Sequence, residues 1–358
     1  MQEQKSKTVW GVSLTHDGGI CQVTDGKIDW FLSEERASRH KHDTNPTFVL
    51  DYIEEETRVN NWVITGLLSK TWEPNHIQEW AKRFDAKVAK WYKKLHGITN
   101  NHIQRIVSEE HHIFHAAAGY YNSGFDEAVV VVSDGMGNLV KYDDEPPSCH
   151  EVESIYHVKN GDFKCIWKNV TPTFIDSDRP YPKCDWINQT AEIGIGMVYS
   201  AMSVYLGFND LGSGIVMGLA GYGGPDPNIK SMLLSPSVID PDQFHRVQYG
   251  ARFIPYDYVK YDGYIEDMTP DHPKFQPLAN LAWRLQVDFE IYMTHLLKTA
   301  VQRTGCKNLV LSGGCALNCV ANYEYLEHLP DDVNLYVEPV SDDSGIPIGA
   351  AYMAYEVC

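Results

Sequence analysis

The chain has 358 residues, of which 43% are hydrophobic and 12% aromatic, and its formal net charge is −18. A chain of this length and composition is expected to fold as a globular protein with two lobes. The negative charge argues against a broad electrostatic contact with nucleic acid, because neutralised phosphates supply much of that affinity. The longest apolar runs are too short to span a bilayer, so a cytoplasmic protein with no membrane contact is expected. The eight scattered cysteines are predicted to be free thiols.

Three stretches each predict a strand that runs into a glycine-rich turn. The first is TVWGVSLTHDGGICQVTDGKIDWFLSEE at 8–35, which is typical of a β-meander with a turn at Asp25 and Gly26. The second is EAVVVVSDGMGN at 127–138, and the third is KNLVLSGGCALN at 307–318. Loops of this kind present backbone N–H groups, so the three turns are expected to converge on one ligand.

Helices are predicted between these strands. The stretch KRFDAKVAKWYKKL at 82–95 places a basic face, Arg83 to Lys94, beside an apolar stripe. A solvated face of a docked helix is favoured there over a contact with a polyanion. The stretch HHIFHAAAGYYNSGF is expected to be helical through its alanines and to stop at Ser123 and Gly124, and another helix is expected over 277–305 with Gly305 as its C-cap. Residues 142–190 and 225–275, rich in Pro, Asp and Tyr, are interpreted as loops or short hairpins.

The stretch SEEHHIFHAAAGYYNSGF at 108–125 contains three histidines. His111 and His115 are four residues apart, so a helix points both imidazoles at one site, where they could bind a metal or simply pair. His112 points roughly 100° away and is expected to pack or form a hydrogen bond. Asp342 and Asp343 precede a small-residue helix near the end of the sequence. They could supply a third metal ligand or cap that helix.

Several motifs occur together in the order known from one enzyme family. They are HD at 16–17, EERASRHKHD at 34–43, HHIFHAAAGYYNSGF, SDGMGN, YLGFN, VMGLAGYG, SGGCALNCVAN and SDDSGIPIGAA. The chain therefore resembles the carbamoyltransferase family of nodulation, cephalosporin and aminoglycoside O-carbamoyltransferases. The resemblance implies an actin-like and sugar-kinase-like (ASKHA) α/β fold, similar to the tRNA threonylcarbamoyl-transferase TsaD. The two lobes are then expected at 1–125 with 340–358, and at 126–339.

The resemblance also implies roles for individual residues. His111, His115 and Asp343 would hold a divalent metal, iron or else manganese or zinc, against the phosphate of a carbamoyl-adenylate. His16 would be the base for the acceptor hydroxyl, with Asp17 as the alternative. Gly135 and Gly137 would approach the phosphate or carbamoyl group by backbone, with Asp134 orienting it. Gly313, Gly314 and Asn318 would line the nucleotide, with a helix cap as the alternative for Asn318.

Longer members of the family continue into a YrdC-like domain that makes carbamoyl-adenylate from carbamoyl phosphate and ATP. Here the sequence stops at Cys358. Either a YrdC-like partner supplies the adenylate, or this chain uses carbamoyl phosphate and ATP, with Mg, itself. The expected acceptor is a hydroxymethylpyrimidine, such as 5-hydroxymethylcytosine, in DNA or a nucleotide. A sugar or antibiotic hydroxyl is the alternative acceptor, and a phosphotransferase or a non-catalytic subunit of a tRNA-modification complex are the alternative functions.

Overall fold

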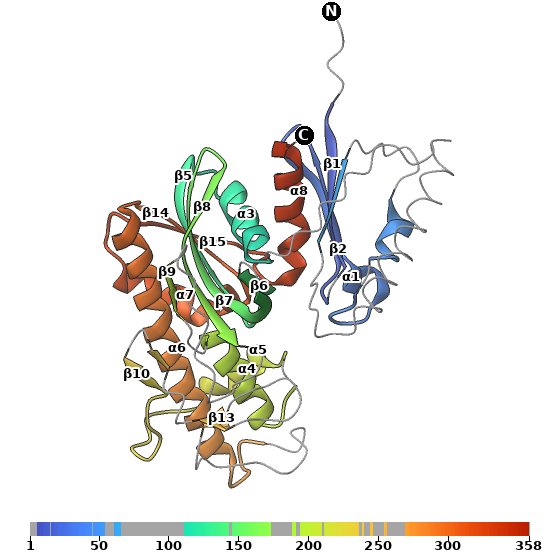
Figure 1. Cartoon of the computed structure of the whole chain (residues 1–358). Helices are drawn as coiled ribbons and strands as arrows, with labels where there is room; N and C mark the ends of the chain where they lie inside the picture. The colour runs from blue at the N-terminus through green and yellow to red at the C-terminus, as the bar shows by residue number, and fades with distance from the viewer. Residues whose placement is uncertain are drawn as a thin grey trace, which may run out of the picture.

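The computed structural model describes residues 6–14, 16–44, 46–53, 61–65, 111–142, 145–172, 188–190, 194–209, 211–235, 238–239, 244–245, 254–255 and 269–357. The predicted basic face at 83–94 lies outside these residues. Two β-sheets dominate the structure, with two helices between them (Figure 1). None of the helices in the described part of the chain is both long and apolar enough to cross a bilayer.

The first sheet has the strand order β3-β2-β1-β4. Its strands are β1 (Thr8–Ser13), β2 (Gly19–Thr24), β3 (Lys27–Ser33) and β4 (Asn61–Thr65). The first three form the predicted antiparallel meander, and β4 pairs with β1 in parallel. Asp25 and Gly26 both have positive φ angles, 48° and 79°, as a two-residue hairpin turn requires. The short helices α1 (Glu34–Ser38) and η1 (Val49–Tyr52) follow β3.

The second sheet repeats this pattern on a larger scale. Its order is β15-β14-β5-β7-β8-β9, with β6 paired to β7. The strands are β5 (Glu127–Ser133), β6 (Leu139–Tyr142), β7 (Glu145–Lys159), β8 (Asp162–Pro172), β9 (Asn188–Thr190), β14 (Asn308–Ser312) and β15 (Asn334–Val337). As β1 does, β5 pairs antiparallel with the next long strand and parallel with a later one, β14.

The prediction of loops or short hairpins over 142–190 is wrong for the described part of that range. β7 and β8 are long strands that pair along most of their length. Most of the second half of β7 is buried, because the sheet is covered on both faces, so the strand has no simple polar and apolar alternation. The turn between them uses Asn160 and Gly161 at positive φ angles of 48° and 78°. In contrast, the prediction of short hairpins over 225–275 is confirmed in its described part by two pairs of short antiparallel strands. They are β10 (Leu233–Ser235) with β11 (Val238–Ile239), and β12 (Phe244–His245) with β13 (Ile254–Pro255).

Most of the remaining helices cover the second sheet or extend below it. They are α4 (Ile195–Tyr205), α5 (Ser213–Ala220), α6 (Phe275–Thr304) and α7 (Cys319–His328). α6 ends at Gly305, whose left-handed φ of 69° confirms the predicted C-cap. One core cluster unites α4 and α6 with β5 and β14, and includes Phe289 and Leu309. Among the residues that the structure describes, the free cysteines are Cys21, Cys165, Cys306, Cys315 and Cys319, as the prediction of free thiols expects.

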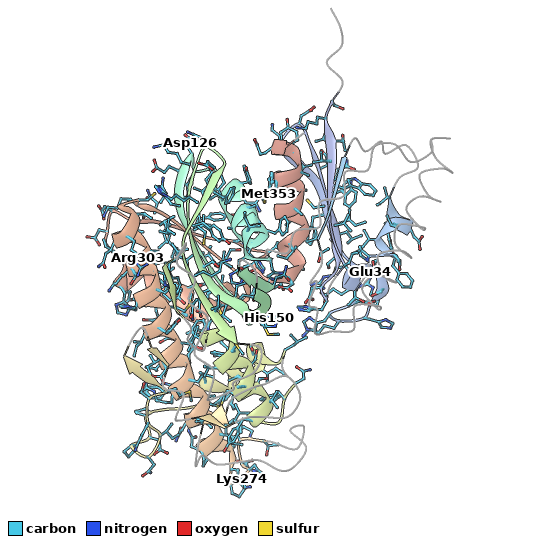
Figure 2. The ribbon with its side chains drawn as sticks, viewed as in Figure 1. Glu34, Asp126, His150, Lys274, Arg303 and Met353 are labelled. Atoms are coloured by element: carbon cyan, nitrogen blue, oxygen red, sulfur yellow. The ribbon has the colours of Figure 1, made fainter. Side chains whose placement is uncertain are left out.

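Helices α3 (His111–Ser123) and α8 (Ile346–Val357) lie between the two sheets, and Met353 on α8 marks this layer in Figure 2. α8 packs against β1 and β2, whereas α3 packs against α8, β5 and β14. A Cβ atom at Gly349 would overlap the carbonyl oxygen of Phe114, and one at Gly11 would overlap that of Pro347. These two glycines therefore allow β1, α8 and α3 to pack closely, which places the start of α3 near the turn before α8.

Candidate functional site

Four buried side chains from three segments meet where the two sheets approach each other. His111 and His115 occupy the first two turns of α3, Asp134 follows β5, and Asp343 begins the single turn η5 (Asp343–Gly345) before α8. Each offers one ligand atom, and these atoms all lie within 4.8 Å of one another. The helical spacing of the two histidines brings their Nε2 atoms to 3.0 Å.

The geometry of this cluster fits a divalent metal. His111 Nε2 lies 3.2 Å from Asp343 Oδ1 and 3.3 Å from Asp134 Oδ2. His115 Nε2 lies 3.4 Å and 3.9 Å from the same two oxygens. Bonds of about 2.1 Å would place tetrahedral ligand atoms about 3.4 Å apart, so the observed separations match the edges of a coordination shell. Two imidazoles and two carboxylates suit iron, manganese or zinc.

Charge also favours a cation at this position. Burial raises the pKa of Asp134, but the hydrogen bond from His111 and the charges of His111 and His115 together hold this pKa below its ordinary value. Burial likewise raises the pKa of Asp343, but the charge of His111, hydrogen bonds from both cluster histidines and the charge of His16 together hold it well below the usual range. The two carboxylates in turn raise the pKa of His111 well above its ordinary value against the effect of burial, and a divalent cation would supply the same compensating charge to two neutral imidazoles and two ionised carboxylates.

His16 links this cluster to the first sheet. Its Nδ1 hydrogen-bonds with Asp17 Oδ2 at 2.8 Å, and its Nε2 lies 3.2 Å from Asp343 Oδ2. Burial lowers the pKa of His16, but the hydrogen bond to Asp17 and the charge of Asp343 outweigh it and raise this pKa to about 9. The side chain remains 44% exposed, so a molecule in solvent can reach it.

A cavity of about 260 Å³ adjoins the cluster. Its acidic and imidazole wall consists of His16, Asp17, His42, Asp134, Asp342 and Asp343. The opposite wall comes from α4, α5, α6 and the turn after β14, and includes Tyr199, Ser213, Met217, Phe289, Leu317 and Asn318. Neither wall contains a lysine or arginine among the residues that the structure describes. The cavity lining therefore combines polar, metal-type side chains with aromatic and apolar side chains suited to an organic group.

Of the predicted glycines, Gly135 and Gly314 line this cavity, but Gly137 and Gly313 do not. A Cβ atom at Gly137 would press on Glu151, and one at Gly313 would overlap the backbone of Ser133. These two glycines permit close chain packing behind the cavity wall. Gly314 donates its N–H to Asp134 Oδ1 at 3.2 Å, so its backbone holds the carboxylate of the cluster.

The position of Asn318 is compatible with both of its predicted roles, a helix cap and a contact with the nucleotide. Its side chain caps α7 by accepting from the Ala321 N–H at 3.1 Å, and it also lines the cavity. Its amide pairs with that of Gln286 through contacts of 2.9 Å and 3.1 Å. The Tyr199 hydroxyl donates to the same Gln286 at 2.6 Å. This buried polar group fixes the orientation of Asn318.

No role is predicted from the sequence for His42, which lines the cavity. Asp134 is predicted to orient the phosphate or carbamoyl group, and it also lies among the metal-type ligands. Its position at the carboxyl end of β5, directly after a buried strand, is a signal that could have found it. The prediction for His112 is confirmed, since it turns away from the cluster and its Nδ1 bonds with Ser154 Oγ at 2.8 Å. Asp342 caps η5 by accepting from the Ser344 N–H.

Comparison with known proteins supplies a family for this arrangement. The family described as "Carbamoyltransferase N-terminus" matches residues 8–352. The nodulation protein NolNO of Sinorhizobium fredii is 26% identical over 378 residues, which cover 95% of this chain and 46% of that protein. The uncharacterized protein sll1178 of Synechocystis sp. is 25% identical, with 94% of this chain and 55% of that protein covered. The chain thus spans about half the length of these curated relatives.

Solved structures confirm the fold. Full-length HypF in its phosphate- and nucleotide-bound form superimposes with a TM-score of 0.52 at 13% identity, over 98% of this chain and 55% of that one. HypF of T. kodakarensis gives a TM-score of 0.51 at 13% identity, over 97% and 47% of the two chains. Together with the duplicated strand pattern, this likeness confirms the predicted actin-like and sugar-kinase-like α/β fold.

Proposed function

The chain belongs to the carbamoyltransferase family, and we propose that it transfers a carbamoyl group from carbamoyl-adenylate to an acceptor hydroxyl. One observation carries this proposal. A buried cluster of two histidines and two aspartates adjoins a half-exposed histidine at the wall of one cavity. The cluster suits a phosphate held through a cation, and the histidine suits proton transfer from a hydroxyl.

In the proposed reaction, the acceptor oxygen attacks the carbamoyl carbon. The bond between that carbon and the phosphate oxygen breaks, and AMP leaves. The hydroxyl proton passes to Nε2 of the neutral form of His16, because Nδ1 of this ring is engaged by Asp17, and with the pKa of His16 at about 9 an alkaline pH favours that form. A hydroxyl is a poor nucleophile until its proton is removed, so a base at this position is required.

The cluster of His111, His115, Asp134 and Asp343 would hold the divalent metal. When bound, such a cation would stabilise the phosphate charge and offset the Asp343 charge that raises the pKa of His16. The part of the cavity lined by Phe289 and Asn318 would hold the nucleotide. Carbamoyl phosphate and ATP, with Mg, would be the source of the adenylate, made by this chain or by a YrdC-like partner.

For the acceptor, we propose a hydroxymethylpyrimidine such as 5-hydroxymethylcytosine, in DNA or as a nucleotide. The exposure of His16 supports an acceptor that enters from solvent with a hydroxyl that projects from its ring, as a hydroxymethyl group does. A neutral or cationic small molecule, such as a sugar or antibiotic, is the second candidate. The aspartates and the lack of lysine and arginine in the described cavity wall favour it.

The test is a direct search for the product. Iron-loaded protein would be incubated with carbamoyl phosphate, ATP and three acceptors: hydroxymethylcytosine DNA, the free nucleotide and an aminoglycoside. Mass spectrometry should then find one added carbamoyl group. Modification of the aminoglycoside alone would select the second acceptor class. Phosphorylated acceptor with ADP would show a phosphotransferase, and no product even with a YrdC-like protein added would refute transferase activity and favour a non-catalytic subunit.

A further inference from the structure

A row of hydrogen-bonded side chains leads from the surface to the cluster. Asp17 Oδ2 pairs with His16 Nδ1 and Asp17 Oδ1 pairs with His42 Nδ1, each at 2.8 Å. An ionised carboxylate can only accept, so both histidines donate their Nδ1–H to Asp17. This fixes the ring of His16 so that its Nε2 points at Asp343 and the cavity.

The backbone on both sides of the Asp17–His42 bond adopts an uncommon conformation. Asp17 and His42 have left-handed φ angles of 58° and 56°. Such angles are uncommon outside glycine, although Asp and His adopt them more often than most residues, and they recur where function needs a defined geometry. The Gly18 N–H donates to the Asp43 carbonyl at 2.9 Å, so a backbone bond ties the two loops beside the side-chain bond. The His42 N–H also donates to Glu35 Oε2 at 3.2 Å.

The exposed fractions of these three side chains show why the hydrogen bonds to Asp17 matter for the orientation of His16. The side chain of Asp17 is 9% exposed, whereas those of His42 and His16 are 29% and 44% exposed. With 44% of its side chain exposed, the His16 ring is oriented in part by its hydrogen bond to Asp17 and its contact with Asp343. Without His42, Asp17 Oδ1 loses its hydrogen bond, so the carboxylate is held less firmly in this orientation. The orientation of the His16 ring would then be less defined.

We propose that His42 is a positioning residue that acts through Asp17 to hold the His16 ring with Nε2 toward the cavity. This inference rests on the proposed function, in which His16 takes the acceptor proton. The same arrangement, a carboxylate that orients a basic histidine through its Nδ1–H, recurs in unrelated hydrolases. Here a second histidine orients the carboxylate in turn.

Three variants separate the hydrogen bond from the backbone conformation. His42→Asn keeps an N–H donor close to the position of Nδ1, and asparagine tolerates a left-handed φ. His42→Gly also tolerates that φ but removes the donor. His40→Ala is the matched control, because His40 is a neighbouring histidine whose side chain is 82% exposed.

We expect His42→Gly to lower kcat about 10- to 100-fold, the range typical of removing a hydrogen bond that orients a functional histidine. The KM for the adenylate and the melting temperature should stay close to those of the unmutated protein. His42→Asn should recover most of the loss. Equal kcat in the His42→Gly variant and the unmutated protein would overturn the inference. So would an equal loss in both variants, which would mean that the imidazole itself is required.

A second readout does not depend on activity. An imidazole N–H bonded to a carboxylate gives a downfield, slowly exchanging proton signal, which His16→Gln would assign to His16. The signal should persist in His42→Asn and weaken or vanish in His42→Gly. If neither the unmutated protein nor any variant transfers carbamoyl groups but the proton signal behaves in this way, the proposed function fails and the positioning of His16 stands. A signal unchanged in His42→Gly overturns the positioning even in an active enzyme.

Discussion

The buried pair of Lys168 and Glu151 offers the most direct test of how the second sheet supports the site. Lys168 Nζ lies 2.5 Å from Glu151 Oε2, and the two side chains are only 7% and 1% exposed. Glu151 Oε1 accepts from the His112 N–H at 2.9 Å, so this carboxylate also holds the start of α3, where the cluster histidines lie. Lys168→Met would leave a buried carboxylate without its cation. Removing one partner of such a pair costs about 3 to 5 kcal/mol.

We therefore expect Lys168→Met to lower the free energy of unfolding by about 3 to 5 kcal/mol. At about 2 °C per kcal/mol for a large domain, the melting temperature should fall by about 6 to 10 °C. Circular dichroism during heating would measure this. The double variant Glu151→Gln with Lys168→Met should recover at least half of the loss, because no charge remains buried and glutamine still accepts from His112. A loss below about 1 kcal/mol in the single variant, or no recovery in the double one, would refute the reasoning.

Other predictions concern the cluster, the helix contact and pH. Asp134→Asn should reduce the amount of bound metal measured by elemental analysis. His157→Gln is the control, because His157 is partly exposed and lies outside the cluster, and it should leave the metal content unchanged. Equal metal content in the two variants would contradict a metal site at Asp134. Chelation of a metal present at about 100 times its Kd should cost about 2.7 kcal/mol of stability, and an unchanged melting temperature would count against tight binding. Gly349→Val should cost at least about 1 to 3 kcal/mol and lower metal content, because its side chain would collide with α3, while Gly218→Ala, with open space around it, should be tolerated. Burial raises the pKa of Glu151, but His112 and Lys168 beside it lower this pKa to about 2 from 4.5, so its stabilisation is complete above pH 4.5 and should be lost as the pH falls toward 2. Stability that stays constant over that interval would contradict the pair.

The strands and helices with strong local signals could be predicted from the sequence. β1, β5 and β14 are β-branched runs that end at glycine turns, and α6 ends at Gly305 as its C-cap glycine indicates. β7 was missed because burial of its second half on both faces obscures the alternation that marks a strand at a sheet surface. For β8, the alternation of exposed and half-buried residues from Asp162 to Cys165 was an available signal, as was the turn at Asn160 and Gly161.

The site divides in the same way. The pairing of His111 and His115 follows from helical spacing alone. The approach of Asp134 and Asp343 to these histidines depends on the packing of α3 between α8 and the second sheet. The bond between His42 and Asp17 depends on the contact of two loops with left-handed residues, which no spacing along the chain predicts.

The most direct test of the central claim is to follow both products of one reaction. A YrdC-like protein would generate carbamoyl-adenylate in the reaction. The acceptor would be the one that mass spectrometry identifies as carbamoylated, and the metal-loaded protein would be compared with its His16→Ala variant. We expect AMP and carbamoylated acceptor in equal amounts with the unmutated protein, and little carbamoylated acceptor with the variant. Release of AMP without any carbamoylated acceptor, or equal transfer by both proteins, would contradict this expectation.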